Sequence, residues 1–293
     1  MNILFTGGTG HIGRQILSKL CEEGHIISLV VREKTNFNKI DQLKNKINFI
    51  DVNEILSNIS TLKKYKFDII IHAGTSYGRK NESTHDMFSI NLYLPIILLE
   101  FAKSNKVKFF MNFDTILPRK KNLYTLLKNQ FIDWAHFYSS FNSFTFINLR
   151  MDYVYGPNDC RSKFATWVTH SLINNVQVLK LRKGKQLKNF VYIEDMVDAF
   201  ITVFNNLKKF KKKFVQIDIS TGIETSIEEF VKKIHLYTKS KTKLKFVSSP
   251  CKTHEETILT PDPYIIFDLG WEPKNNIESG ILKLIKSVKD IND

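Results

Sequence analysis

The sequence predicts an α/β fold built on a doubly wound parallel sheet, followed by a smaller C-terminal α/β lobe. Short apolar runs alternate with amphipathic stretches over the first half of the chain, and a glycine-rich turn joins the first run to the first amphipathic stretch. The alternation loosens after about residue 150. We therefore expect one α/β domain over residues 1–150, with returns from the C-terminal half, and a lobe over residues 151–293.

The expected elements follow from the spacing of the apolar residues. In the first part, strands are expected at Asn2–Phe5, Ile26–Val31, Ile47–Asp51, Phe67–Ala73, Lys108–Phe113 and Thr145–Arg150. Helices are expected there at Ile12–Glu23, Met87–Asn105 and Tyr124–Ser139, with Pro95 as a kink inside the second. In the lobe, strands at Val176–Leu181, Phe190–Ile193 and Val215–Ile219 interleave with helices at Phe164–Asn174, Ile193–Asn205 and Ser226–Tyr237.

The composition is typical of a globular protein, with 43% hydrophobic and 25% charged residues. The net charge of +14 raises the question of nucleic acid, but the lysines are scattered along the chain. The run at residues 208–213 falls between an expected helix and an expected strand, where a solvated connector is expected. We expect no nucleic-acid partner and instead a small anionic substrate.

Membrane and metal binding are not expected. No apolar run approaches the roughly 20 residues that span a bilayer, and the N-terminus lacks the features of a signal peptide, so we expect a cytoplasmic protein. Cys21, Cys160 and Cys251 lie far apart, without a neighbouring cysteine or a histidine cluster. This spacing predicts neither a disulfide framework nor a zinc site.

The glycine-rich turn predicts a dinucleotide site. Gly7 permits the tight turn, Gly10 lets the backbone approach a pyrophosphate, and Gly13 lets the following helix pack on the strand. At the start of that helix, His11 and Ile12 would present free N–H groups to the phosphates. The fold class therefore becomes a Rossmann-type sheet, with residues 1–150 as its dinucleotide-binding domain.

The end of the second strand predicts NADP(H) rather than NAD(H). An NAD site usually has an acidic residue there for the ribose hydroxyl, whereas this chain has Val31 followed by Arg32. The Arg32 guanidinium can pair with a 2′-phosphate, and Arg14 adds a second positive charge. A solvated Arg32 with no cofactor preference remains the alternative.

Several further segments, taken in chain order, resemble the extended short-chain dehydrogenase/reductase family of the NAD-dependent epimerase/dehydratase type. After the glycine turn come Asp51-Val52, His72-Ala73-Gly74-Thr75, Asn91, the Tyr124–Lys128 pair (YxxxK), Tyr155-Gly156-Pro157, residues 188–195 and Leu269-Gly270-Trp271-Glu272-Pro273. The resemblance covers nearly the whole chain. It implies that Asp51 and Val52 contact adenine, that residues 72–75 line the cofactor, and that Asn91 is structural.

Tyr124 and Lys128 are the expected catalytic pair, because residues four apart share one face of a helix. A nearby ammonium is expected to lower the pKa of the phenol, so that Tyr124 can exchange a proton with the substrate. The resemblance implies a third hydroxyl, but its position is occupied by Phe113. Thr115 is the expected substitute because it faces the same side of an extended segment, with Asp114 as the alternative.

Within the family, the segments at residues 72–80, 112–115 and 155–164 are similar to those of CDP-abequose-forming 4-ketoreductases, which reduce nucleotide-linked 4-keto-6-deoxy sugars. Two matches are imperfect: Lys188 replaces an arginine that contacts the diphosphate, and Tyr153 replaces an asparagine. The residues expected to contact the nucleotide-diphosphate sugar are Tyr77, Asp114, Tyr153, Lys163, Phe164, Leu181 and Lys188.

The leading hypothesis is an NADPH-dependent 4-ketoreductase of a CDP- or dTDP-linked 4-keto-6-deoxy or 3,6-dideoxy hexose, in deoxysugar biosynthesis for a surface polysaccharide. A 4-epimerase or 4,6-dehydratase with tightly bound NAD is the alternative, although a dehydratase would have Asp-Glu where this chain has Asp114-Thr115. A non-catalytic dinucleotide sensor is the alternative of another class. The family resemblance also implies a homodimer through the helices expected at Met87–Asn105 and Tyr124–Ser139.

Overall fold

The computed structural model describes residues 1–79, 81–141, 143–182, 184–247 and 260–290. Lys80, in the segment after the fourth strand, and Cys251 lie outside the described residues. The chain divides into two units. Unit 1 comprises Met1–Arg150 and Val203–Ile217, and unit 2 comprises Met151–Thr202 and Asp218–Asp293.

Unit 1 is built on a seven-stranded sheet with the order β10-β6-β5-β4-β1-β2-β3. The adjacent strands from β3 to β5 are parallel, which confirms the predicted doubly wound fold. The strand order reverses at β1 and β4, the point where open α/β sheets bind their ligands. The strands are β1 (Asn2–Thr6), β2 (Ile26–Val31), β3 (Ile47–Asp51), β4 (Ile69–His72), β5 (Phe109–Thr115), β6 (Thr145–Met151) and β10 (Phe214–Ile219).

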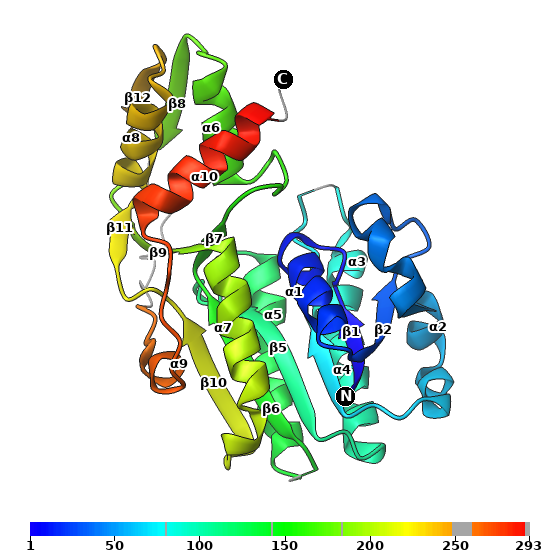
Figure 1. The fold of residues 1–293 in the computed structure, drawn as a ribbon. Helices are drawn as coiled ribbons and strands as arrows, with labels where there is room; N and C mark the ends of the chain where they lie inside the picture. The colour runs from blue at the N-terminus through cyan, green and yellow to red at the C-terminus, as the bar shows by residue number, and fades with distance from the viewer. Residues whose placement is uncertain (80, 142, 183, 248–259, 291–293) are drawn as a thin grey trace. The chain divides into compact units, whose positions relative to one another are not determined.

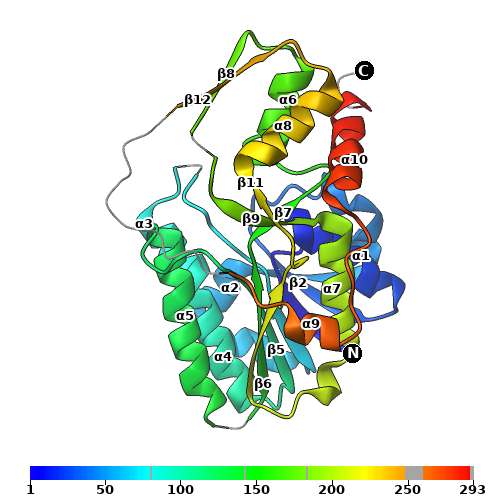
Figure 2. The same cartoon turned by 90° about the vertical axis from the view of Figure 1, so that its left-hand side faces the viewer.

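Helices cover both faces of this sheet because its strands are apolar on both sides. Helices α4 (Leu94–Ser104) and α5 (Leu123–Ser139) lie side by side on one face, and α1 (His11–Glu22) lies on the other (Figure 2). Phe110 of β5 stacks on Phe146 of β6 at 5.3 Å between ring centroids, and Phe131 of α5 packs edge-on against Phe146. Shorter helices of unit 1 include η1 (Asn38–Lys46), α2 (Val52–Ser57), η2 (Ile59–Lys64) and η4 (Leu207–Lys209).

The prediction of one long helix at Met87–Asn105 is wrong in one respect, because the helix is not regular throughout. The structure has α3 (Thr84–Phe88), a π-helical turn η3 (Ser89–Tyr93) and then α4, with Pro95 in the first turn of α4. Proline cannot donate to the carbonyl four residues earlier, and the wider π turn falls where that bond would form. The irregularity therefore precedes Pro95 rather than kinking the middle of one helix.

The stretch Thr84–Ser104 is long and apolar enough to cross a membrane by length and composition, which corrects the expectation that no segment approaches this length. Half of its most apolar window is buried inside the structure. The core helix of a globular protein passes the same test, and α4 packs against β4 and α5.

Unit 2 contains two small sheets and a group of helices (Figure 1). Strands β7 (Tyr153–Tyr155), β9 (Leu187–Tyr192) and β11 (Glu224–Ser226) form one sheet, and β8 (Val178–Arg182) pairs in parallel with β12 (Lys243–Val247). Helices α6 (Phe164–Ile173), α8 (Ile227–Thr238) and α10 (Ile277–Asp290) pack on one another, and the remaining helices are α7 (Ile193–Asn205) and α9 (Tyr264–Asp268).

The core of unit 2 explains why two of the family-like segments are structural. Phe190 stacks on Phe230 at 4.0 Å between ring centroids. Asp195, at the end of the segment 188–195, accepts hydrogen bonds from the backbone N–H groups of Lys274 and Asn275. Its own carbonyl accepts from Trp271 Nε1 at 3.1 Å. The Trp271 segment is therefore held to the start of α7 by one buried carboxylate.

Candidate active site

The glycine turn lies at the switch point of the sheet. Gly7 follows β1 with φ of +79°, in the left-handed region that favours glycine, and a side chain there would overlap the backbone of Ala73. A Cβ on Gly13 would overlap the Gly7 carbonyl. A Cβ on Gly10 would meet only the Gly7 carbonyl oxygen, at 3.2 Å. A side chain at Gly7 or Gly13 would therefore overlap the protein backbone, whereas a Cβ at Gly10 would make a single tight contact with one backbone oxygen.

This arrangement fits a dinucleotide. Helix α1 begins at His11, and its N-cap residue, Gly10, provides no side-chain hydrogen bond to the first N–H groups. Those groups and the positive end of the helix dipole suit phosphate oxygens. The first helical bond runs from Arg14 N to Gly10 O. Arg14 is therefore in the first turn, together with His11 and Ile12.

The segment after β4 is fixed beside the glycine turn by three side chains. Thr6 Oγ1 lies 2.8 Å from His72 Nδ1 and accepts a hydrogen bond from Gly74 N. Asn91, fully buried in the π turn, accepts from Ser76 N and donates to Ser76 O. Residues 72–75 therefore lie next to the turn, as a cofactor-lining segment requires, and Asn91 has the structural role that the resemblance implied.

The residues expected around adenine and its ribose lie at the ends of β2 and β3. Val31 pairs with Asp51 across the two strands, so Arg32 follows β2 at the same edge where Asp51 ends β3. Arg32 is exposed, whereas Val52 is buried. Asp51 caps α2 by accepting from Asn53 N at 2.7 Å. Asp51 therefore has a structural role in addition to the predicted contact with adenine.

The proposed catalytic residues come together at the end of β5 and the start of α5. Asn122 caps α5, which places Tyr124 in its first turn and Lys128 one turn later. Lys128 is fully buried, and its Nζ donates to the carbonyl oxygen of Phe113 at 2.7 Å. Thr115 accepts a hydrogen bond from Leu117 N through Oγ1 and is hydrogen-bonded to the Tyr124 hydroxyl. The structure thus brings Thr115, Tyr124 and Lys128 together.

The electrostatics differ from the expectation in one important way. Burial raises the pKa of Tyr124 well above its ordinary value, and the charge of Asp114 raises it further, whereas the Thr115 hydrogen bond lowers it. The expectation that Lys128 lowers the pKa of this phenol is therefore wrong for this structure. Burial lowers the pKa of Lys128 itself to about 8. The buried ammonium bonds Phe113 O and interacts with the Asp114 carboxyl rather than with the phenol.

An aromatic and a cationic side chain cover Tyr124. The ring of Tyr77 lies 5.0 Å from the ring of Tyr124. The guanidinium of Arg79 lies 5.2 Å from the centre of the Tyr77 ring, a cation–π distance. Tyr77 therefore lies beside Tyr124, and its contact with the substrate stays a prediction. Sequence reasoning missed Arg79, although it stands two residues from Tyr77 in a segment that the resemblance had singled out.

Sequence reasoning also missed two buried amides behind Asp114. Asn112 Nδ2 donates to Asn148 Oδ1 at 2.8 Å, and Asn148 Nδ2 donates to Asp114 Oδ2 at 2.8 Å. Both amides are fully buried, in β5 and β6. The signal was present in the sequence, because an asparagine inside an apolar strand needs a buried partner.

Several of the residues expected to contact the substrate lie in unit 2, and most of them already have partners within the protein. Lys188 Nζ forms an ion pair with Asp152 at 2.9 Å and is 20% exposed. Lys163 is the N-cap residue of α6, which Phe164 begins. The Tyr153 ring lies 4.9 Å from the Phe190 ring and packs edge-on against Phe164, whereas Leu181 is buried in β8. Lys188 therefore already has an anionic partner, which the sequence did not reveal.

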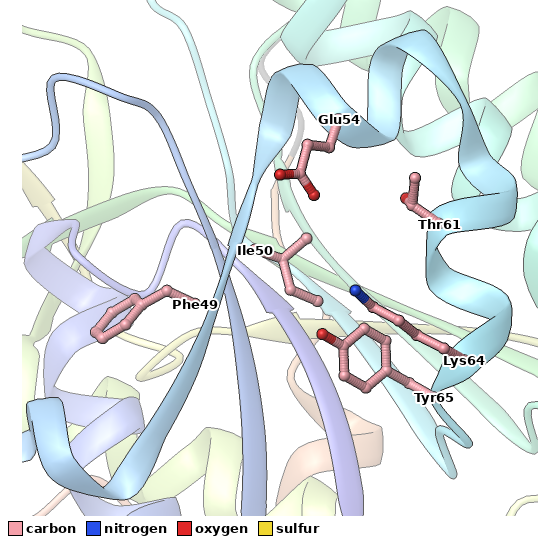
Figure 3. Close-up of a pocket in the computed structure, with 6 residues that line it drawn as sticks. All are labelled: Phe49, Ile50, Glu54, Thr61, Lys64 and Tyr65. Atoms are coloured by element: carbon pink, nitrogen blue, oxygen red, sulfur yellow. The ribbon is translucent and has the colours of Figure 1, made fainter.

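A separate pocket of about 170 Å³ lies in unit 1 beside β3, α2 and η2 (Figure 3). Figure 3 shows Glu54 and Lys64 among the side chains around it. Its lining residues are Phe49, Ile50, Glu54, Thr61, Lys64 and Tyr65. None of the predicted site residues lines this pocket, and it is smaller than the 300 Å³ or so that ligand sites usually offer. We do not assign the dinucleotide to it.

Comparison with known proteins agrees with this geometry. The profile of the NAD dependent epimerase/dehydratase family matches residues 3–217. The chain is 25% identical to CDP-abequose synthase of Salmonella typhimurium over 97% of both chains, and 24% identical to dTDP-D-glucose 4,6-dehydratase of Mus musculus over 97% of this chain and 87% of the relative. A UDP-glucuronic acid 4-epimerase from Bacillus cereus, solved with UDP-glucuronic acid and NAD, matches 99% of this chain and 100% of its own with a TM-score of 0.83 at 18% identity.

Proposed function

Because this chain belongs to the NAD dependent epimerase/dehydratase family of enzymes that act on nucleotide sugars, we propose that it is a reductase within that family. Its substrate would be a CDP- or dTDP-linked 4-keto-6-deoxy or 3,6-dideoxy hexose, reduced at C4 with NADPH in the cytoplasm. The product would serve deoxysugar biosynthesis for a surface polysaccharide such as a lipopolysaccharide O-antigen. The 25% identity to CDP-abequose synthase over 97% of both chains supports this choice.

Tyr124 is the group expected to supply the proton in this reduction. The pKa of Tyr124 is raised well above its ordinary value, so the phenol keeps its proton near neutral pH. A protonated phenol can donate to the oxygen of a ketone that is being reduced, whereas oxidation of an alcohol needs a base at the same position. The choice of reduction over an initial oxidation therefore rests on the similarity to CDP-abequose synthase.

The residues of this chain would divide the work as follows. The glycine turn and residues 72–75 would hold a reduced nicotinamide dinucleotide, which would supply the hydride for the carbonyl carbon. Tyr124 donates the proton that completes the alcohol, and the Thr115 hydroxyl, which is hydrogen-bonded to Tyr124, stabilises the phenolate that remains. Lys128 supplies positive charge from the buried side of the site.

The preference for NADPH rests on Arg32. Its guanidinium follows β2 at the edge where Asp51 ends β3, and Val31 occupies the position of an NAD-type carboxylate. A planar guanidinium matches a 2′-phosphate, which a carboxylate would repel. Arg14 in the first turn of α1 adds a second cation for the phosphates.

The diphosphate of the substrate would be bound by Lys163 and Lys188 of unit 2. Lys188 is held in place by Asp152, which also accepts a hydrogen bond from Asn189 N at 3.0 Å. This pairing reduces the charge that Lys188 can offer and orients its ammonium. Lys163 precedes α6, whose positive end would favour the same anion.

An epimerase or dehydratase is the second candidate. Solved relatives of similar fold hold NAD, and Asp114 lies beside Tyr124 and Lys128, where a second acid–base group would be needed. Thr115 follows Asp114, so the chain lacks the acidic pair expected of a dehydratase. The sensor hypothesis is less well supported, because Tyr124 and Lys128 are both present and the pair lies beside Thr115.

We also propose a homodimer through the face formed by α4 and α5. Aromatic side chains are exposed on this part of unit 1, and Lys103 Nζ lies 3.6 Å from the centre of the Phe141 ring. An exposed aromatic patch of this kind is typical of an interface. The exposed rings are Phe88, Tyr93, Trp134, Phe137 and Phe141.

The reductase is tested by following the absorbance of NADPH or NADH with each of the two nucleotide-linked ketosugars. Substrate-dependent, stoichiometric loss of NADPH is expected, with Tyr124→Phe inactive and Arg32→Asp shifted toward NADH. NMR of the product then gives the configuration at C4. Tightly bound NAD in the purified protein, with no net consumption of cofactor, would favour the epimerase or dehydratase instead.

A further inference from the structure

Behind the Tyr124–Lys128 pair, the buried chain Asn112–Asn148–Asp114 runs from β5 to β6 and back to β5. Each amide donates to the next residue, at 2.8 Å in both steps, and the chain ends on Asp114 Oδ2. The amides are fully buried and Asp114 is 6% exposed. A hydrogen bond in such surroundings is stronger than in water, and its loss is correspondingly costly.

These hydrogen bonds make the two carboxyl oxygens of Asp114 different from each other. Oδ2 accepts from Asn148, whereas Oδ1 is buried and has no hydrogen-bond partner among the described residues. An oxygen that accepts from an amide N–H is a poor place for the carboxyl proton. The proton of a neutral Asp114 would therefore reside on Oδ1, and a charged Asp114 would leave Oδ1 as an acceptor.

Asp114 acts on both members of the catalytic pair. Its negative charge raises the pKa of Tyr124 and the pKa of Lys128. Burial raises the pKa of Asp114 itself, while Lys128, the Asn148 hydrogen bond, a hydrogen bond from the Thr115 backbone N–H and Arg150 lower it. These groups face Asp114 from α5, β5 and β6, and His72 faces Lys128 from β4. Whether Asp114 is charged thus depends on a balance to which Asn148 contributes.

We infer that Asn148, supported by Asn112, is a positioning residue that holds the Asp114 carboxyl beside the Tyr124–Lys128 pair and stabilises its charged form. The inference deepens the proposed reductase function and rests on it for its kinetic consequences. Neither amide touches the groups that react. Both act through Asp114, which distinguishes them from residues that merely fill the core.

The first test needs no substrate. Carbon-13 NMR follows the titration of the aspartate carboxyl carbons, with the Asp114 signal assigned by Asp114→Asn. We expect Asn148→Leu to move the Asp114 pKa upward, because the carboxylate loses a donor. Thr145→Val, a buried polar change in the same strand, should leave it unchanged. Asn112→Leu should give a smaller upward shift and replaces Asn148→Leu if that variant does not fold. An unchanged Asp114 pKa in the folded variants overturns the inference.

The second test is kinetic. Loss of turnover on the acid side of the kcat profile should follow protonation of Asp114, so this limb should move to higher pH in Asn148→Leu. We expect kcat at neutral pH to fall about tenfold while KM stays within about threefold. In an Asp114→Asn background, Asn148→Leu should have little further effect. Equal effects in both backgrounds would overturn the inference. A wild type that reduces no ketosugar would refute the proposed function alone, because the NMR titration would still decide the role of Asn148.

Discussion

Lys128 Nζ donates to the carbonyl oxygen of Phe113 across 2.7 Å, which joins the second turn of α5 to the end of β5. Both residues are buried, so the strand end cannot move without breaking a charge-assisted bond in a poorly solvated environment. The two residues that follow Phe113 are Asp114 and Thr115. The lysine therefore fixes the backbone that presents the carboxyl and the hydroxyl of the proposed site.

This buried ammonium makes stability depend on pH. The pKa of Lys128 is lowered from 10.5 to about 8, so between these values the unfolded chain binds more protons than the folded one. The free energy of unfolding contributed by this group therefore rises with pH over that window. We expect the stability of the wild type relative to Lys128→Met to increase by roughly 2 kcal/mol from pH 7.5 to pH 9.5. Urea unfolding at several pH values measures it, and parallel curves for the two proteins would contradict it.

Thr115 offers a cleaner test of the chemistry. Thr115→Val removes the hydroxyl that bonds Tyr124 but keeps the shape of the side chain. We expect kcat to fall about 100-fold, as for loss of one donor to a developing oxyanion, with KM nearly unchanged. Thr115→Ser, which retains the hydroxyl, should restore most of the rate. Full activity of Thr115→Val would exclude Thr115 from this role.

The fold was largely predictable because its signals are local. The strand Ile26–Val31 is an apolar run interrupted only by Ser28, and its expected bounds are confirmed. The expected helix Met87–Asn105 was wrong because a π turn leaves the apolar pattern almost unchanged. The C-terminal helix Ile277–Asp290 was missed, although Ile281, Leu284 and Val288 repeat at helical spacing.

The site was less predictable because its properties depend on tertiary contacts. Spacing alone placed Tyr124 and Lys128 on one face, but it could not show that the ammonium bonds Phe113 O instead of the phenol. The partners of Asp114 lie in another strand, and Lys188 meets Asp152 from 36 residues away. Contacts of this kind between distant parts of the sequence determine the pKa shifts and ion pairs of the site. The catalytic roles of the residues stay predictions.

Two glycines of the turn are expected to have different roles, Gly13 in the stability of the fold and Gly10 in binding of the dinucleotide. A Cβ on Gly13 would overlap the Gly7 carbonyl, whereas a Cβ on Gly10 meets only that oxygen at 3.2 Å. We expect Gly13→Ala to lower the free energy of unfolding by about 2 kcal/mol or more and to abolish dinucleotide binding. Gly10→Ala should lower the Tm less than Gly13→Ala does but should weaken NADPH binding, because its methyl group occupies space for the pyrophosphate. Thermal unfolding and fluorescence titration distinguish them, and equal Tm losses would contradict this division.

The proposed dimer is tested on the exposed face of α5. Phe137 is 58% exposed there, and a lysine in its place would put a charge into an apolar interface. We expect Phe137→Lys to shift the protein from dimer to monomer in light scattering at micromolar concentration, while the Tm measured under the same conditions shows that it remains folded. Leu236→Lys is the matched control, because Leu236 is 68% exposed on α8 of unit 2 and belongs to none of the elements of the proposed interface. A monomeric wild type, or dissociation by the control but not by Phe137→Lys, would refute an interface on α5.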